Sequence, residues 1–358
     1  MDKINSITAK IKGIKYTPLL CRKLNTFNFN ELDKALSKDA TFILKIDDKN
    51  QIALSWWVSA KRTRSYPYSR VYDSLSFAGK KVTIIPIVKD EGIDGDRDFL
   101  QWDTVSLMSL LGVYVIIAYY NDATQSSRYD KKITEQRFDI DYLKSQIKKL
   151  LSYQSDALHW NLSQIDNIAE IGRKALDSYD KISQKVGVGM HSKKSAEKRI
   201  LELKKGKDAF MALSRNLAEL AQKRESGTTH FAEHLEGTKG TITITNYLGG
   251  NYYFTSDEVK IVGKNINLVE GKNTKDDKLP ALGDIKDGLL KMILFTNLEE
   301  VQVDNKKFNP VPILKLTTAD TFKLENINKS PKEMLEVLKK EAKTNNFKIL
   351  LNKKFLEG

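Results

Sequence analysis

A strand, a helix and a second strand follow one another in this sequence, and this succession constrains the fold more than any other stretch. KKVTIIPIV (80–88) has the branched apolar residues of a buried strand, DFLQWDTVSLMSLL (98–111) has helical length and spacing, and VYVIIAYY (113–120) is another buried strand. A strand–helix–strand unit returns to its sheet by a right-handed crossover, which covers at least one face of that sheet. The sequence therefore predicts α/β architecture here.

The rest of the chain divides by its hydrophobic patterning. TFILKI and QIALSWWVSA predict two strands paired across the turn at 47–50, which extends the α/β region over residues 1–135. Residues 136–228 carry apolar residues at helical spacing, as in long amphipathic helices that pack together or against a second subunit. Residues 229–358 return to α/β. We expect an N-terminal α/β domain, a helical middle segment and a C-terminal α/β domain.

The C-terminal domain is predicted to contain strands, a helix and a further strand, in that order. GTITITNYL (240–248) alternates as a strand does, and two more strands, 251–263 and 264–275, are joined by a glycine turn. A helix over 284–298 has apolar residues along one side, and NPVPILKLTT (309–318) is the next expected strand. The predicted class is α/β, or α+β, with a mixed sheet flanked by helices in this domain.

Charge and cysteine content narrow the partners and the compartment. The 358 residues carry a formal net charge of +13, and such an excess favours polyanionic partners, of which nucleic acid is the commonest. The single cysteine, Cys21, excludes an internal disulfide and fits a reducing cytoplasm. No signal-peptide pattern is present, and the longest apolar stretch, 106–120, is too short to span a membrane. We expect a soluble cytoplasmic protein without a membrane partner.

Two acidic residues and a lysine near the end of the predicted hairpin are the strongest catalytic candidates. Glu270 and Lys272 are separated by Gly271 alone, so their side chains project from the same face of a strand. Asp257 lies in the preceding strand and can face the same cleft if the two strands pair antiparallel. Gly271 is expected to leave room for the lysine to reach past the chain.

This trio suits metal-dependent hydrolysis of a phosphodiester. Two carboxylates hold Mg²⁺, a hard cation that prefers oxygen ligands and retains some water. The ion lowers the pKa of a bound water and neutralises charge that builds on the phosphate. The lysine can orient or deprotonate the attacking water and stabilise the transition state. The expected cofactor is Mg²⁺, held by Asp257 and Glu270 and assisted by Lys272.

The arrangement resembles the PD-(D/E)XK nuclease superfamily, which includes most type II restriction endonucleases. Asp257 matches the first acid of the motif, although Ser256 stands where the motif has proline, and Glu270-Gly271-Lys272 matches its second element. The order of elements over residues 229–320 is also similar. The resemblance implies a restriction-endonuclease-like core, cleavage that leaves a 5′-phosphate, a homodimer that cuts both strands of double-stranded DNA, and a cognate DNA methyltransferase as genetic partner.

Residues just before this core give two further candidates. The superfamily often carries an additional acid ahead of its strands, and Glu233 or Glu236 could supply it; each could equally be a solvated residue at a helix end. HFAEH (230–234) fits an inverted zinc-protease pattern, in which two histidines share a helix face. Its helix would be short and no third ligand is evident, so the histidines could instead lie near DNA phosphates.

The N-terminal domain holds a rival catalytic set. Asp73, Lys89 and Asp103 imitate the same nuclease with its second acid moved from the strand to the helix. However, Ile87 occupies the usual position of that acid, and the stretch around Lys89 is so acidic that a match arises easily by chance. The sequence leaves both interpretations of this set open.

A basic and aromatic segment of the same domain, WWVSAKRTRSYPYSRVY (56–72), is the candidate DNA-contacting element. Arginine grips phosphate or pairs with guanine, and tyrosine stacks on bases. The same pattern also describes tyrosines that cover a sheet edge beside solvated arginines. The candidate residues are Lys61, Arg62, Arg64, Tyr66, Tyr68 and Arg70.

Together these features predict an Mg²⁺-dependent DNA endonuclease. Its leading form is a type II restriction endonuclease that cuts double-stranded DNA at a specific site. The N-terminal domain would recognise the target, and the helical segment would act as a linker or supply a dimer interface. The alternatives are a defence or repair nuclease with structure-dependent cutting and a non-catalytic DNA-binding protein.

Overall fold

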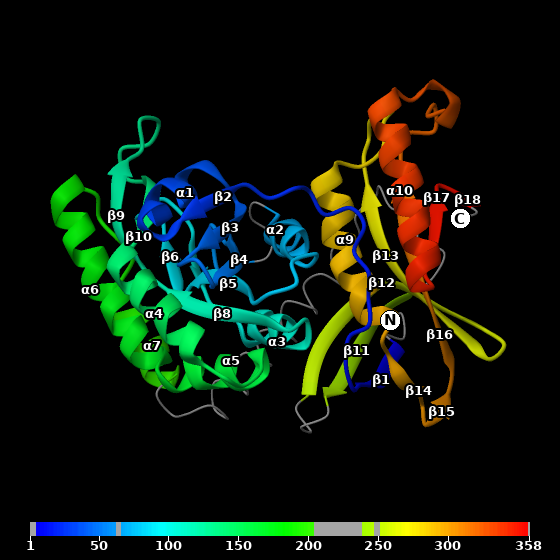
Figure 1. The fold of residues 1–358 in the computed structure, drawn as a ribbon, viewed down its shortest axis with the longest axis horizontal. Coiled ribbons are helices and arrows are strands. Elements are labelled where there is room, and N and C mark those ends of the chain that lie inside the picture. Colours follow the sequence, from blue (N-terminus) through cyan, green and yellow to red (C-terminus); the bar gives the residue numbers. More distant parts are fainter. Residues whose placement is uncertain (1–4, 62–65, 204–237, 247–250, 357–358) are drawn as a thin grey trace. The chain divides into compact units, whose positions relative to one another are not determined.

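The computed structural model describes residues 5–61, 66–203, 238–246 and 251–356. These residues mix helices and strands throughout, which confirms the predicted α/β class (Figure 1). Within these ranges, no helix combines the length and the apolar character needed to cross a lipid bilayer.

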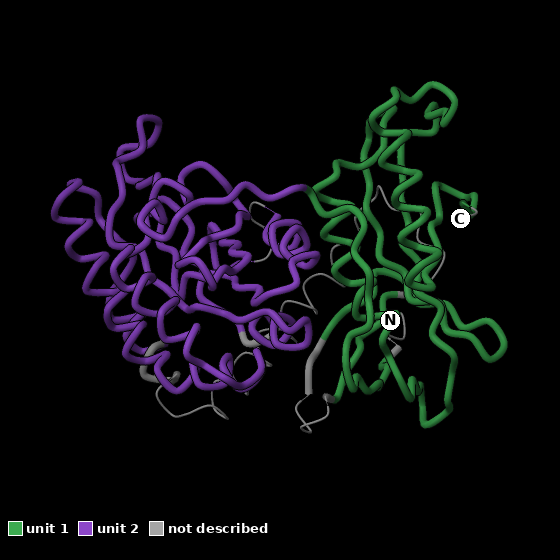
Figure 2. The backbone as a smooth tube through the Cα atoms, viewed as in Figure 1, with its two compact units in different colours: residues 1–22, 217–358 green, residues 23–216 purple. Residues whose placement is uncertain are grey.

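The chain forms two compact units rather than three consecutive domains (Figure 2). Residues 1–22 and 217–358 make one, here called the C-terminal unit, and residues 23–216 make the other, here called the inserted unit. The boundaries thus differ from those expected from the sequence. The first residues leave the N-terminal α/β region to join the C-terminal sheet, and the helical segment joins the α/β strands that precede it.

The C-terminal unit is built on a mixed sheet with the strand order β15-β14-β1-β11-β12-β13-β16-β17-β18. Its strands are β1 (Asn5–Ile11), β11 (Thr238–Asn246), β12 (Asn251–Val262), β13 (Asn265–Asn273), β14 (Glu299–Val303), β15 (Lys306–Lys307), β16 (Asn309–Thr317), β17 (Lys348–Leu351) and β18 (Lys354–Leu356). Strand β1 pairs parallel with β11 and antiparallel with β14. This pairing places the N-terminal strand within the sheet and makes the inserted unit an insertion between β1 and β11.

The centre of this sheet has the order of elements predicted from the sequence. Strands β11, β12 and β13 pair antiparallel in succession. Helix α9 (Leu282–Phe295) then leads to β16, which lies parallel to β13, and α10 (Lys329–Asn345) leads to β17, parallel to β16. Helix α9 packs against β13 and β16 and buries apolar side chains such as Leu289 and Ile293. Figure 1 shows α9 and α10 alongside the strands that they connect.

The inserted unit has a second mixed sheet with the order β2-β3-β4-β5-β8 and two small strand pairs, β6-β7 and β9-β10. Its strands are β2 (Thr26–Asn28), β3 (Thr41–Lys45), β4 (Gln51–Trp56), β5 (Lys81–Pro86), β6 (Val88–Asp90), β7 (Arg97–Phe99), β8 (Val113–Ala118), β9 (Tyr120–Gln125) and β10 (Ile133–Phe138). Its helices are α1 (Leu32–Lys38), α2 (Pro67–Ser74), α3 (Trp102–Leu110), α4 (Ile140–Ser152), α5 (Ala157–Asp166), α6 (Ile168–Val186) and α7 (Lys193–Leu203).

The strand–helix–strand unit predicted over residues 80–120 is confirmed as β5, α3 and β8. Strands β5 and β8 are parallel neighbours, with Lys81 opposite Val113 and Pro86 opposite Ala118. The predicted strand pair across 47–50 is confirmed as β3 and β4, and the Asp47 carboxylate accepts the backbone N–H of Asn50 in the turn.

The segment after β1 is tied to helix α10 by the buried carboxylate of Glu341 and by Asn345, which exchanges two hydrogen bonds with the backbone of Thr17. Glu341 has no exposed surface. Its Oε1 accepts a hydrogen bond from the Tyr16 hydroxyl at 2.8 Å, and its Oε2 accepts the backbone N–H groups of Leu19 and Leu20 at 2.9 and 3.0 Å. These three bonds fix the chain at the point where it leaves the C-terminal unit for the inserted unit.

We predict that Glu341→Ala lowers the free energy of unfolding by about 2–4 kcal/mol, because it leaves buried donors without their charged acceptor. Glu336→Ala is the matched control on the same helix. Its side chain is 61% exposed and pairs with Lys339, so its loss should change stability by less than about 1 kcal/mol. Urea denaturation measures both variants, and equal effects would contradict the anchoring role of Glu341.

Candidate catalytic site

The register of the β12–β13 hairpin brings the two predicted acids together. Glu258 lies opposite Val269, and the ladder runs to Val262 opposite Asn265. One residue beyond this ladder, the same register places Asp257 opposite Glu270. Residues directly opposite one another in an antiparallel pair share a face of the sheet. The backbone N–H of Gly271 also donates to Oδ2 of Asp257 at 2.8 Å, which holds the Asp257 carboxylate against β13.

Ser256, which stands where the nuclease motif has proline, reinforces the same place in the hairpin. The residue has no exposed surface. Its Oγ lies 2.9 Å from the carbonyl oxygen of Val269 on the neighbouring strand and 2.9 Å from that of Glu258. A proline has no hydroxyl to make these contacts. The departure from the motif therefore adds a link between the strands that carry the two acids.

Lys272 lies between two carboxylates. Its Nζ is 3.1 Å from Oε1 of Glu270 and 2.6 Å from Oδ2 of Asp287, which comes from helix α9. Only 15% of the Lys272 side chain is exposed. Asp287 was not anticipated from the sequence, and it fixes the direction in which the lysine points.

Lys291, four residues after Asp287 on α9, is a second cation at this centre. Its Nζ lies 2.5 Å from Oε2 of Glu270 and 3.2 Å from the carbonyl oxygen of Thr255. The i, i+4 spacing puts Asp287 and Lys291 on one face of the helix. A charged pair at that spacing within the apolar run DGLLKMILF is the sequence signal that would have found both residues.

The two acids differ in their electrostatic surroundings. Burial raises the pKa of Glu270, and the charge of Asp257 adds to the rise, against the opposing effects of Lys291 and Lys272. Burial also acts to raise the pKa of Asp257, but Lys291, the Gly271 N–H and Lys272 outweigh it and leave this pKa below its ordinary value. Asp257 therefore ionises before Glu270, as expected for two interacting carboxyl groups.

The surroundings of Lys272 favour its charged form. Burial acts to lower its pKa, but the carboxylates of Glu270 and Asp287 outweigh burial and raise the pKa above its ordinary value. Lys272 is therefore held as a cation at neutral pH. A lysine in that state can orient water or stabilise negative charge, but it is poorly suited to act as a general base.

The donor set at this centre suits a hard cation that keeps part of its water. Within the described residues, no three or more histidine, cysteine, aspartate or glutamate side chains are grouped so as to hold a metal ion. The centre instead offers the Asp257 and Glu270 carboxylates. A pair of carboxylates, with the remaining ligands supplied by water and phosphate, is the usual arrangement for Mg²⁺.

The candidate DNA-contacting residues are divided between the surface and the interior of the inserted unit. Lys61 is exposed, and Tyr66 is 52% exposed at the residue before α2. Tyr68 is only 5% exposed and packs edge-to-face against Trp57. The Arg70 guanidinium lies 4.6 Å from the centre of the Trp56 ring and donates to the Trp56 carbonyl. Tyr68 and Arg70 therefore pack against the sheet, and Arg70 is not the solvated arginine of the structural interpretation.

The structure describes only part of the rival catalytic set, Asp73, Lys89 and Asp103, in the inserted unit. Asp73 is buried on α2. Lys89 lies on β6 and forms an ion pair with Glu91 at 2.8 Å. Arg62, Arg64, Glu233, Glu236 and the HFAEH histidines lie outside the described residues, as does the side chain of Asp103.

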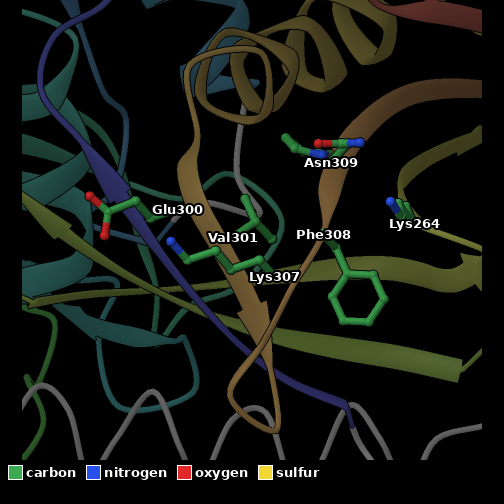
Figure 3. A pocket seen from close by; sticks show the side chains of 7 residues that line it. Lys264, Glu300, Val301, Lys307, Phe308 and Asn309 are labelled. Carbon is green, nitrogen blue, oxygen red and sulfur yellow. The ribbon is translucent and has the colours of Figure 1, made fainter.

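A cavity of about 380 Å³ opens in the C-terminal unit at the other end of β13 (Figure 3). It is lined by Lys264, Glu300, Val301, Lys307, Phe308, Asn309 and Pro310. Lys264 immediately precedes β13, whereas Glu270 lies six residues further along. The cavity and the carboxylate centre are therefore separate features of the sheet.

Comparisons with known proteins found no matching family model, no matching curated protein and no matching solved structure.

The space for Lys272 comes from Gly288 of α9 rather than from Gly271. A Cβ on Gly271 would come no closer than 3.7 Å to its nearest neighbour, Oδ2 of Asp257. A Cβ on Gly288 would lie 2.7 Å from Cδ1 of Leu314 and 3.1 Å from Cε of Lys272. The expectation that Gly271 clears a path for the lysine was wrong, because the lysine runs along the sheet face toward the helix.

We predict that Gly288→Ala lowers the free energy of unfolding by about 1–2 kcal/mol, since overpacking exceeds the helix-propensity gain of alanine. Gly271→Ala, the matched control, should change it by less than about 1 kcal/mol. Thermal denaturation compares the two variants. Equal stability of Gly288→Ala and the unmodified protein would show that the helix and Lys272 move apart without cost.

Proposed function

We propose that this protein is an Mg²⁺-dependent endodeoxyribonuclease whose active site is the centre formed by Asp257, Glu270 and Lys272. The observation that carries the proposal is the convergence of these three side chains on one face of adjacent strands, ahead of a helix that crosses to a parallel strand. The resemblance of the motif to PD-(D/E)XK nucleases supports the same assignment. The formal net charge of +13 favours a polyanionic substrate.

The proposed reaction is hydrolysis of a phosphodiester. The oxygen of a water molecule attacks phosphorus, the bond to the 3′-oxygen breaks, and one proton of that water ends on the 3′-oxygen through solvent, which leaves a 5′-phosphate and a 3′-hydroxyl. Asp257 and Glu270 would hold the magnesium ion, which when bound would supply positive charge to the phosphate. Lys272 remains protonated between Glu270 and Asp287, so it orients the water and stabilises the charge that develops on phosphate oxygen.

The biological form that we propose is a type II restriction endonuclease of the cytoplasm, acting on double-stranded DNA. Two active sites are needed to cut both strands, which favours a homodimer. A cognate DNA methyltransferase would protect the host DNA. We assign target recognition to the inserted unit, where Lys61 and Tyr66 are exposed. Discrete fragments from phage DNA would support this form, whereas cutting only at flaps or ends would favour a defence or repair nuclease.

We predict that Asp257→Asn, Glu270→Gln and Lys272→Met each reduce Mg²⁺-dependent cleavage of phage DNA by at least about 10²-fold while leaving DNA binding in place. The measurement is gel analysis of the products, followed by sequencing of their ends.

Glu258→Gln is the matched control for these variants. Glu258 is a buried acid on the same strand, but it lies on the opposite face of the sheet and pairs with Lys315 at 3.3 Å. Its variant should still cut DNA. Cleavage that survives in all three site variants and disappears in Asp73→Asn and Lys89→Met would transfer the active site to the inserted unit. DNA binding without any cleavage by the unmodified protein would leave only a binding function.

A further inference from the structure

Lys291 is among the most buried charged residues that the structure describes, and its position is costly. The side chain is 5% exposed and comes from a helix whose neighbouring residues, Leu290 and Met292, are fully buried. Removing an ammonium group from water costs several kcal/mol, and a well-packed apolar residue at such a position is often neutral or stabilising. Packing alone therefore does not account for a lysine here.

The contacts of Lys291 are directed at the strand residues that flank and form the candidate active site. Its Nζ contacts Glu270 on β13 and the carbonyl of Thr255 on β12, two residues before Asp257. Its charge also lowers the pKa of Asp257. One ammonium group thus links both strands of the hairpin at the place where the two acids meet.

Lys291 and Lys272 together engage both oxygens of Glu270. Lys272 lies beside Oε1 and Lys291 beside Oε2. One oxygen of Asp257 accepts the Gly271 N–H. A first divalent cation can share the remaining lone pairs of these carboxylates, because each carboxylate oxygen has two. A second cation beside Glu270 would have to displace an ammonium group.

The net charge of the centre also disfavours the binding of a second divalent cation. The acids Asp257, Glu270 and Asp287 are balanced by the two lysines, which leaves one net negative charge when all five groups are ionised. One divalent cation reverses that charge to a single positive one. A second would leave three positive charges in a buried site, where repulsion between ions about 3.5–4 Å apart is strong.

We infer that Lys291 is a positioning residue that acts as a fixed cation beside Glu270, in the place of a second metal ion, and limits the Asp257–Glu270 pair to one divalent cation. The inference rests on the proposed metal-dependent function and specifies the metal stoichiometry of the same site. Helix α9 then contributes a charged group to the centre in addition to packing against the sheet.

The test is a titration of the full-length protein with Mn²⁺ in the absence of DNA, followed by electron paramagnetic resonance of the free ion. The unmodified protein should bind one Mn²⁺, and Asp257→Asn should abolish this binding. Lys291→Met should bind two ions, because the ammonium group that occupies the place of the second ion has been removed from the site. Lys291→Arg should keep the single site.

Two further variants separate charge from packing. Lys291→Gln retains a hydrogen-bond donor toward Glu270 and Thr255 but has no charge. It should therefore bind Mn²⁺ as Lys291→Met does. Added Mn²⁺ should also raise its melting temperature by more than it raises that of the unmodified protein. Lys315→Met removes the partly buried ion pair with Glu258 on the other face of the sheet and should bind one ion with unchanged affinity.

The outcomes distinguish this inference from the function on which it rests. A single bound Mn²⁺ in both Lys291→Met and Lys291→Gln would overturn the inference and leave the proposed function intact. Two ions bound by the unmodified protein would also overturn it. The absence of Mn²⁺ binding by the unmodified protein would contradict the proposed function, and the inference with it.

Discussion

Glu270 is a carboxylate buried inside a sheet, and the two ammonium groups beside it offset the cost of that burial. Glu270 is 2% exposed, and each of its carboxylate oxygens faces a lysine. One lysine comes from the same strand and the other from α9. The helix must therefore lie close to β13, and Gly288 permits this close approach by leaving room for the Lys272 side chain.

The crossover from β13 through α9 to β16 surrounds the centre with packed elements. Strand β16 pairs with β13 along its whole length, from Asn265 opposite Asn309 to Asn273 opposite Thr317. The helix between them buries most of its residues against the sheet. Acids on the hairpin and charged groups on the helix are thus held by packing elements rather than by loops. Such support is what a catalytic centre needs if its groups are to keep their distances during a reaction.

The discontinuous C-terminal unit explains how a large insertion is accommodated. Strand β1 occupies a position between β14 and β11, and the segment after it is bonded to Glu341 of α10 before the chain departs for the inserted unit. The inserted unit has its own sheet and its own buried core. Each unit can therefore be stable through its own contacts, as expected for separate domains.

The sequence by itself determined the α/β class, the β3–β4 and β12–β13 hairpins, and the β5–α3–β8 and β13–α9–β16 successions. These depend on local periodicity and on turn residues, which are visible in short windows. It also placed Asp257, Glu270 and Lys272 on one face, since side-chain alternation along paired strands follows from the backbone alone.

Only the tertiary structure decided the rest. The pairing of β1 with β11 joins residues more than two hundred positions apart, and no local pattern encodes such a contact. Asp287, Gly288 and Lys291 belong to the centre because α9 packs over β13, and their roles depend on distances across that interface. Likewise, Tyr68 is buried against Trp57, and the half-buried Arg70 lies over the Trp56 ring, although their sequence pattern fits a DNA surface equally well. Burial and long-range pairing are properties of the assembled fold, and they determine which charged residues act as a group.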